Sequence, residues 1–192
     1  MSAPAASIGP EEQRLLFSLI RSAIQARLAG DPAPDLPPHG RELSRPAGAF
    51  VTLRLEGALQ GCIGFVETER PLVESVRELA VRAAFHDGRF SPLLPEQFEG
   101  LEIEISVLTP PLPIPPSSLP GAVEVGRDGL IVRHRGRSGL LLPQVASERS
   151  WDPLTFLQQT SRKAGLPPEA WSEEGAVVEA FRCEVYQESQ NL

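Results

Sequence analysis

The strongest constraint on the fold is a strict alternation of apolar and polar residues in three segments. The stretch 49–66 is typical of a hairpin, with AFVTLRL and LQGCIGFV as strands around a turn near 56–58, and LEIEISVLT (101–109) alternates in the same way. A period of two places one set of side chains on a buried sheet face and the other set on the opposite face. These segments therefore predict a sheet with one apolar and one polar face.

The register of the hairpin follows from this alternation. The apolar residues of both strands share a face if the loop has an odd number of residues, and three residues including Gly57 satisfy this condition. In that register Cys62 lies opposite Thr52, and Gln60 lies opposite Arg54. The second face of the hairpin then carries polar and small residues: Thr52, Arg54, Gln60, Cys62 and Gly64.

Helical periodicity predicts three helices around these strands. The first covers 11–29, with Pro10 at its start and Gly30 as its stop, and we expect it to pack on the rest of the domain. Pro71 opens the second, which ends near 86–88. The third runs from the cap Asp152 to Gly165. Their apolar stripes predict that all three contribute to a core.

The remaining chain predicts loops and further strands. The proline-rich stretches DPAPDLPPHG (31–40) and TPPLPIPPSSLP (109–120) exclude a helix interior or a central strand. Further strands are expected at 122–126, at 129–134 and 139–142 around a GRSG turn, and at 177–187. Helices mixed with hairpin-connected strands predict an α+β fold with a mainly antiparallel sheet, arranged as a single domain over residues 1–192.

Composition narrows the classes of function. The net charge of −7, from 25 acidic and 18 basic side chains, opposes a nucleic-acid partner. No apolar run is long enough for a membrane span, and the N-terminus lacks the features of a signal peptide, so we expect a cytoplasmic protein. The two cysteines and three histidines show no metal-ligand spacing, and no glycine-rich phosphate loop is present. The sequence thus predicts no metal site and leaves any cofactor unknown.

Six segments stand out along the chain, in this order: LQGCIG (59–64), DGRFSPL (87–93), LEIEISVLTP (101–110), VGRDGLIV (125–132), LLLPQVASERSWDPLTFL (140–157) and KAGLPPEAW (163–171). Together they resemble the AMMECR family, which is named after a human chromosomal region whose deletion gives Alport syndrome, midface hypoplasia and elliptocytosis. The resemblance covers about 41–187. The resemblance implies an α+β fold of a larger and a smaller lobe with a cleft between them. It implies no settled activity and no cofactor.

The resemblance also suggests protein partners, and at two positions this sequence differs from the usual family pattern. Prokaryotic members are often encoded beside a Memo-like protein and a radical-SAM protein, which motivates a protein partner, although this chain lacks the CxxxCxxC cluster of a radical-SAM enzyme. Gln60 stands where the family commonly has arginine, so an anion held there would need Arg54 or Arg89 instead. Gly88 stands where the family usually has another residue, often proline.

Cys62, in the GCIG stretch, is the sharpest candidate for catalysis. Its flanking glycines, Gly61 and Gly64, allow close backbone approach, and a nucleophilic thiol would also need a base or a positive charge nearby. The alternative is a small packed thiol. Glu104 shares the polar face and would serve as acid or base if its strand lies near that of Cys62; equally, it would pair with an arginine.

Other polar residues complete the candidate site. Ser106 lies on the same face as Glu104, and Arg89 would either clamp a carboxylate or phosphate, or cap carbonyls and bridge the lobes. Gln144 and Lys163 belong to the later family segments and are further ligand-binding candidates. Two functions remain open at this point: an enzyme acting on a small anionic metabolite, or a non-catalytic adaptor for a protein partner.

Overall fold

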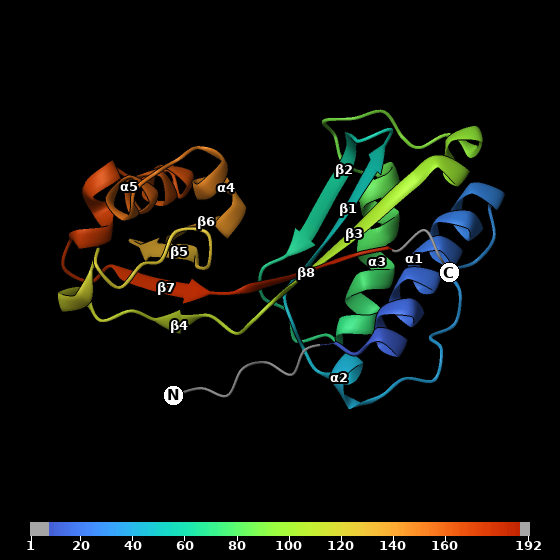
Figure 1. Ribbon diagram of the computed structural model, residues 1–192, viewed down its shortest axis with the longest axis horizontal. Helices are drawn as coiled ribbons and strands as arrows, with labels where there is room; N and C mark the ends of the chain where they lie inside the picture. Colours follow the sequence, from blue (N-terminus) through green and yellow to red (C-terminus); the bar gives the residue numbers. More distant parts are fainter. Residues whose placement is uncertain (1–7, 189–192) are drawn as a thin grey trace. The chain divides into compact units, whose positions relative to one another are not determined.

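The computed structural model describes residues 8–188 and has the α+β architecture that the sequence predicts (Figure 1). The chain forms two compact units. Unit 1 contains the chain up to residue 108 and from residue 184 onward, and unit 2 contains residues 109–183. Each unit holds one four-stranded sheet. Within the described residues, no helix combines the length and the apolar character required to cross a membrane.

Unit 1 packs two long helices on one face of its sheet. The strands follow the order β2-β1-β3-β8, and in Figure 1 β1, β2 and β3 lie in front of α3. The elements of unit 1 are α1 (Pro10–Ala29), α2 (Arg41–Ser44), β1 (Ala49–Leu55), β2 (Ala58–Phe65), α3 (Leu72–Phe85), the 3₁₀ helix η1 (Pro95–Gly100), β3 (Leu101–Leu108) and β8 (Cys183–Gln187).

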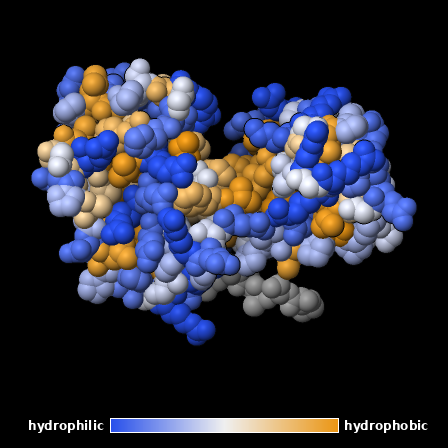
Figure 2. Space-filling model, turned by 180° about the vertical axis from the view of Figure 1, so that it is seen from behind, coloured by the Kyte–Doolittle hydropathy of each residue, from blue (hydrophilic) through white to orange (hydrophobic). Residues whose placement is uncertain are grey.

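The buried face of this sheet is the apolar face that the alternation predicts. Val51, Leu53 and Ile105 are fully buried, as are Ile20 of α1 and Val76 of α3. The predicted apolar stripe of α3 is entirely buried: Leu72, Val73, Val76, Leu79, Ala80 and Ala83. Seen from behind, most of the visible surface is hydrophilic (Figure 2). The apolar sets therefore form the core of unit 1.

The ends of α1 are set by the residues that the sequence singles out. Pro10 occupies the first turn, where its missing N–H is harmless, and Glu11 and Glu12 complement the positive helix N-terminus. Gly30 ends the helix with a φ of 78°, a left-handed conformation that glycine adopts without a steric penalty. This prediction is confirmed.

The β1–β2 hairpin confirms one predicted pair and corrects another. Thr52 pairs with Cys62 as expected, but Arg54 pairs with Leu59 rather than with Gln60. The turn has two residues, Glu56 and Gly57, both with positive φ, and a bulge follows at the Leu53/Arg54 step. A two-residue turn matches the twist of the strands, and the bulge restores the parity that a three-residue loop was expected to supply.

Gly61 allows β2 to lie directly against α3. A Cβ atom at this position would come within 2.0 Å of the Ala83 carbonyl oxygen, so no side chain fits between the strand and the helix. Gly61 faces the helix and belongs to the apolar set, whereas Cys62 points to the other face.

Unit 2 has the strand order β4-β7-β5-β6. Its core contains the fully buried Leu130, Val132, Phe156 and Leu157. The elements of unit 2 are β4 (Leu112–Pro113), the 3₁₀ helix η2 (Pro116–Ser118), β5 (Gly129–His134), β6 (Arg137–Leu141), α4 (Pro143–Glu148), α5 (Pro153–Lys163), the 3₁₀ helix η3 (Pro168–Ser172) and β7 (Val177–Phe181). Asp152 caps α5 by accepting a hydrogen bond from the Thr155 N–H at 2.7 Å, which confirms the predicted start of that helix.

The strand predicted at 122–126 is wrong, because this stretch forms turns. The Asp128 carboxylate accepts a hydrogen bond from the Glu124 N–H at 2.8 Å, and the Asp128 N–H donates to the Glu124 carbonyl at 2.9 Å. A side chain that bonds its own backbone in this way closes a loop and competes with a strand.

Two further strand boundaries differ from the prediction. The β5–β6 turn consists of Arg135 and Gly136 alone, and the rest of the expected GRSG turn lies in β6. The strand expected at 177–187 is divided at Arg182 into β7 of one sheet and β8 of the other. There the Arg182 N–H donates to Thr109 Oγ1, and the Thr109 N–H donates to the Arg182 carbonyl. The apolar alternation continues through this break, so it could not reveal the change of sheet.

The contact at Gly61 predicts a large loss of stability on substitution. We expect Gly61→Ala to lower the free energy of unfolding by about 2–3 kcal/mol, because the methyl group must displace the backbone of α3. Gly88→Ala is the matched control, since a Cβ atom there meets nothing within 4 Å. Urea unfolding followed by far-UV circular dichroism measures both variants. An equal midpoint for Gly61→Ala and the wild type would contradict the close packing.

Candidate functional site

The candidate site lies on the second face of the unit 1 sheet, away from α1 and α3. Thr52 pairs with Cys62 on one side and with Glu104 on the other, so these three residues form one row across β2, β1 and β3. Phe50 and Ser106 form part of the next row. Thr52 and Ser106 are buried, whereas Cys62 and Glu104 are half-buried.

Direct proton exchange between Glu104 and Cys62 was expected only if their strands were neighbours, and they are not. Strand β1 separates β3 from β2, so the two backbones lie two strand spacings apart, about 10 Å. The Glu104 carboxylate accepts a hydrogen bond from Gln187 Nε2 at 3.3 Å. Among the described residues it forms no ion pair with Arg54 or Arg89. Glu104 shares the face of Cys62 but is not its neighbour.

Three polar groups hold Cys62. Its Sγ accepts a hydrogen bond from Thr52 Oγ1 at 3.2 Å. Its backbone N–H donates to Asp87 Oδ2 at 2.9 Å, and its carbonyl oxygen accepts from Arg89 Nη2 at 3.1 Å. The thiol is therefore fixed both through its own sulfur and through its backbone.

Asp87 and Arg89 form a two-pronged ion pair beside Cys62. Arg89 Nε donates to Asp87 Oδ1 at 2.9 Å, and Nη2 donates to Oδ2 at 2.6 Å. The Asp87 side chain is only 5% exposed, whereas that of Arg89 is 60% exposed. The second terminal nitrogen of Arg89, Nη1, makes no hydrogen bond with a described residue. Arg89 thus holds the Cys62 backbone through Nη2 and keeps Nη1 as a hydrogen-bond donor for another group.

This pair shifts the pKa values of both members. The hydrogen bond from Arg89 holds the pKa of the Asp87 carboxyl far below its usual range. Burial opposes this shift, but the backbone N–H groups of Cys62 and Arg89 also favour the charged form. The hydrogen bond to Asp87 correspondingly raises the pKa of Arg89. Asp87 is therefore a carboxylate at neutral pH.

The chain folds locally so that this pair meets the edge of the sheet. Helix α3 ends at Phe85 with His86 as its C-cap, so Asp87 and Arg89 follow directly from the helix end. Strand β2 is the first strand of the order β2-β1-β3-β8, and within residues 8–188 no strand lies beyond its outer edge. At Cys62, Asp87 supplies the acceptor and Arg89 the donor that such a strand would provide. Arg89 thus contacts one carbonyl, that of Cys62, while its expected roles in anion binding or in bridging the lobes stay predictions.

Asp87 itself was missed by the sequence reasoning. It opens the DGRFSPL segment, in which the sequence analysis singles out only Gly88 and Arg89. The available signal was a carboxylate directly after a helix end and two residues before an arginine. Nothing in the sequence, however, shows that this pair reaches the backbone of Cys62, twenty-five residues earlier.

Packing accounts for the two glycines beside Cys62 and for Gln60. A Cβ atom on Gly64 would come within 2.2 Å of the Phe50 ring, and one on Gly61 would meet α3. Gln60 Nε2 donates to the Ser91 carbonyl at 2.9 Å and so ties β2 to the segment that follows Arg89. Close packing is therefore a sufficient reason for both glycines.

Unit 1 also has an open hollow of about 710 Å³ at the start of β3. It contains the predicted residues Arg54 and Glu104, but neither Cys62 nor Arg89. Its lining is rich in carboxylates and consists of Arg21, Arg54, Glu56, Phe98, Glu99, Gly100, Leu101, Glu102, Ile103, Glu104, Gln187 and Glu188. The predicted site residues of unit 1 thus divide between the Cys62 region and this hollow.

Gln144 and Lys163 belong to unit 2. Gln144 lies on α4, and its buried Oε1 accepts no hydrogen bond from any residue that the structure describes. Lys163 is the exposed last residue of α5. Over residues 8–188, no group of three or more histidine, cysteine, aspartate or glutamate side chains is arranged to hold a metal ion.

The lowered pKa of Asp87 predicts a pH-dependent contribution to stability. At neutral pH we expect Asp87→Asn to lower the free energy of unfolding by about 2 kcal/mol, a value reduced by the exposure of Arg89. A lowered folded pKa stabilises above the unfolded pKa, so the deficit should shrink as the pH falls below about 4. Urea unfolding at several pH values measures this trend. The exposed Asp35→Asn serves as the control; a deficit independent of pH would contradict the assignment.

Comparisons with known proteins agree on one family. The AMMECR1 family profile matches residues 17–186. A protein of Methanothermobacter thermautotrophicus is 41% identical, covering 95% of this chain and 97% of its own, and one of Thermococcus gammatolerans is 44% identical, covering 94% and 92%. The crystal structure of the uncharacterized protein PH0010 from Pyrococcus horikoshii aligns with a TM-score of 0.84 at 42% identity, covering 95% and 94%. The chain belongs to the AMMECR1 family.

Proposed function

We propose that this AMMECR1-family protein is an enzyme acting on a small anionic metabolite, which binds on the polar face of unit 1 beside Cys62. The observation that supports this proposal is the set of three hydrogen bonds that fix a half-buried thiol through Sγ, N–H and C=O. A cysteine that reacts with a ligand needs a fixed orientation, access to the ligand and polar neighbours.

The anionic character of the ligand follows from the donors around the thiol. Arg89 Nη1 remains available next to the Cys62 carbonyl. Arg54 shares the face of Thr52 and is exposed, but its Nη1 donates to the Gly57 carbonyl at 3.4 Å and it lines the separate hollow, so Arg89 is the donor closest to the thiol backbone. Because Asp87 balances the charge of Arg89, we expect recognition through directed hydrogen bonds more than through net positive charge. A carboxylate or a phosphate accepts such bonds well.

The proposed roles follow from these positions. Cys62 is the reacting group and Arg89 binds the anion, whereas Arg54 belongs to the separate hollow. Glu104 and Ser106 lie farther along the face, where they would contact the ligand and not the sulfur. Gly61 and Gly64 serve packing, and Gln144 and Lys163 in unit 2 are left outside the proposed site. We also propose a cytoplasmic location, because a free thiol such as Cys62 stays reduced there.

The competing proposal is a non-catalytic adaptor for a protein partner such as a Memo-like or radical-SAM protein. It rests on the gene association of the family, and no contact around Cys62 favours it. A small ligand that shields Cys62 is expected only if the first proposal holds, so protection of the thiol separates the two.

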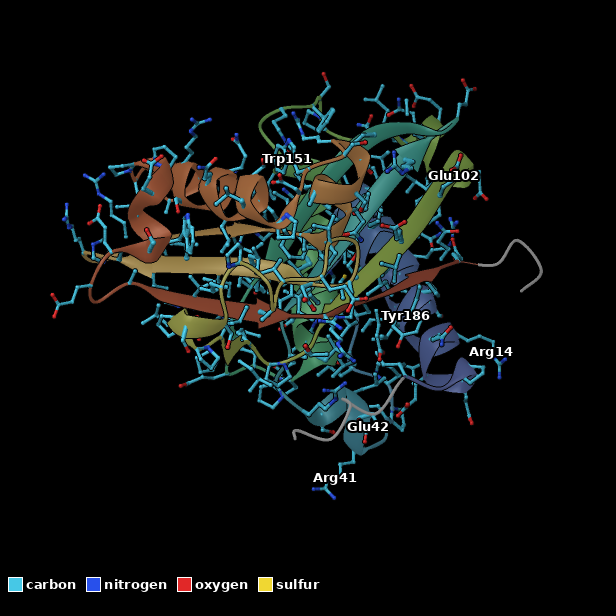
Figure 3. All side chains as sticks on the ribbon, turned by 60° about the vertical axis from the view of Figure 1, so that its left-hand side comes forward. Arg14, Arg41, Glu42, Glu102, Trp151 and Tyr186 are labelled. Atoms are coloured by element: carbon cyan, nitrogen blue, oxygen red, sulfur yellow. The ribbon has the colours of Figure 1, made fainter. Side chains whose placement is uncertain are left out.

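We expect small anions to protect Cys62 from alkylation. In a Cys183→Ser background, iodoacetamide should modify Cys62 in the native protein, and inorganic phosphate or succinate should slow this reaction saturably, at least about fivefold. Arg89→Gln should abolish the protection because it removes the anion donor. Arg14→Gln, an exposed change on α1 (Figure 3), should leave it intact. Mass spectrometry of the labelled protein gives the rates.

Two results would overturn the proposed site. One is a Cys62 thiol that resists alkylation until the protein unfolds. The other is a rate that neither anion changes at concentrations that saturate weak sites.

A further inference from the structure

The two edges of the unit 1 sheet differ in whether their outward backbone groups are hydrogen-bonded. At the β2 edge, the outward N–H and C=O of Cys62 are both satisfied, by Asp87 and Arg89. At the other edge, β8 is the last strand of the order, and no described strand lies beyond it. An unpaired strand edge is a template for another strand, and proteins usually block it where pairing would be harmful.

The hydrogen bonds of β8 show which of its groups face outward. The Glu188 N–H donates to the Ile103 carbonyl of β3 at 3.0 Å. In an antiparallel ladder, alternate residues direct their N–H and C=O groups to opposite sides. The backbone groups of Val185 and Gln187 therefore point away from β3. Among the described residues, none forms a hydrogen bond with them.

The side chains along this edge are accessible. Val185 is 42% exposed, one of the few large hydrophobic residues of the described chain with that exposure, and Gln187 is exposed as well. Tyr186 turns to the helix side, where its hydroxyl accepts a hydrogen bond from the Ile8 N–H at 3.0 Å (Figure 3). An added strand would thus find free backbone groups and an apolar contact at Val185.

The charges around the edge favour a basic partner. Glu184 lies on β8, Glu188 follows its last residue, and the Gln187 side chain donates a hydrogen bond to Glu104. The hollow at the end of β8 is lined by five glutamates against two arginines, and one of these, Arg21, is already paired with Glu188 at 2.6 Å. Phe98 adds an aromatic surface that already carries Arg21 at 5.7 Å from its ring centroid. Glu188 is paired with Arg21 and Glu184 accepts a hydrogen bond from the Tyr186 hydroxyl, but the other glutamates of the hollow form no ion pair with a described residue and would meet lysine or arginine side chains.

We propose that the outer edge of β8 binds an extended segment of a protein partner with lysine or arginine at alternate positions, added to the sheet as a fifth strand. Its backbone pairs with Val185 and Gln187, and its basic side chains reach Glu184, Glu188 and the hollow. Main-chain hydrogen bonds supply affinity, and the carboxylates supply selectivity. This surface is separate from Cys62 and does not depend on the proposed enzymatic activity.

Binding of a designed peptide to the full chain tests this surface. The probe is a fluorescent, end-blocked eight-residue peptide that alternates lysine with valine or threonine. We expect a dissociation constant below about 1 mM by anisotropy, and at least about tenfold weaker binding when alternate amides are N-methylated. The same peptide with glutamate in place of lysine should not bind. Hydrogen exchange should show the Val185 and Gln187 amides becoming protected.

A pair of variants at one position separates strand pairing from simple charge attraction. Gln187→Pro removes an outward N–H, which an edge strand tolerates, and should weaken peptide binding at least about tenfold. Gln187→Ala loses the same side chain but keeps the N–H, so it should bind the peptide at least about tenfold more tightly than Gln187→Pro does. Circular dichroism checks that both variants fold, and exchange protection of the wild type is a readout that needs no variant.

The proposal fails on any of four outcomes: no binding at about 1 mM peptide, equal binding of the glutamate peptide, no effect of N-methylation, or unprotected Val185 and Gln187 amides. Self-association of the chain through β8, seen as a dimer by sedimentation that excludes the peptide, would also overturn it. Cys62→Ser should leave peptide binding unchanged, so a failure of the thiol proposal remains distinguishable.

Discussion

Burial of one sheet face against α1 and α3 is the constraint on which the rest of unit 1 depends. Val51, Leu53 and Ile105 must face the helices, and Gly61 lets α3 come close enough to exclude water. Once that face is fixed, a period of two sends Thr52, Cys62 and Glu104 to the opposite face without further choice. The candidate site is therefore a geometric consequence of core packing, and a one-residue slip would abolish it.

The sequence predicted the parts of this structure that depend on a local pattern. The limits of α1 and the cap at Asp152 follow from residues next to each other, and the pairing of Thr52 with Cys62 follows from alternation. Errors arose where two backbone geometries place the same side chains on the same sheet face. A three-residue loop and a two-residue turn followed by a one-residue bulge do so, and alternation alone does not distinguish them. The division at Arg182 was invisible because alternation continues into β8 of the other sheet.

The candidate site was predicted only in part, for a different reason. Residue type and strand face identified Cys62, but its polar support comes from Asp87 and Arg89, which reach it through the end of α3. Tertiary contacts of this kind have no spacing rule. For Glu104, the strand order was the missing information. Its sheet face was predicted correctly, but β1 lies between β3 and β2 and so separates Glu104 from the thiol of Cys62.

The support of Cys62 and the open edge of β8 are two solutions to one problem, the unpaired backbone of a sheet that ends on both sides. A buried carboxylate carries a desolvation penalty, and Asp87 stays charged only because Arg89 and two N–H groups compensate for it. A single exposed charged side chain or a proline would be enough to block the pairing of another strand with this edge. That β2 instead uses a paired, buried carboxylate at Cys62 argues that this carboxylate restrains the Cys62 backbone as well as covering the edge. The absence of any such device at Val185 and Gln187 among the described residues then distinguishes β8 as the edge left available for pairing.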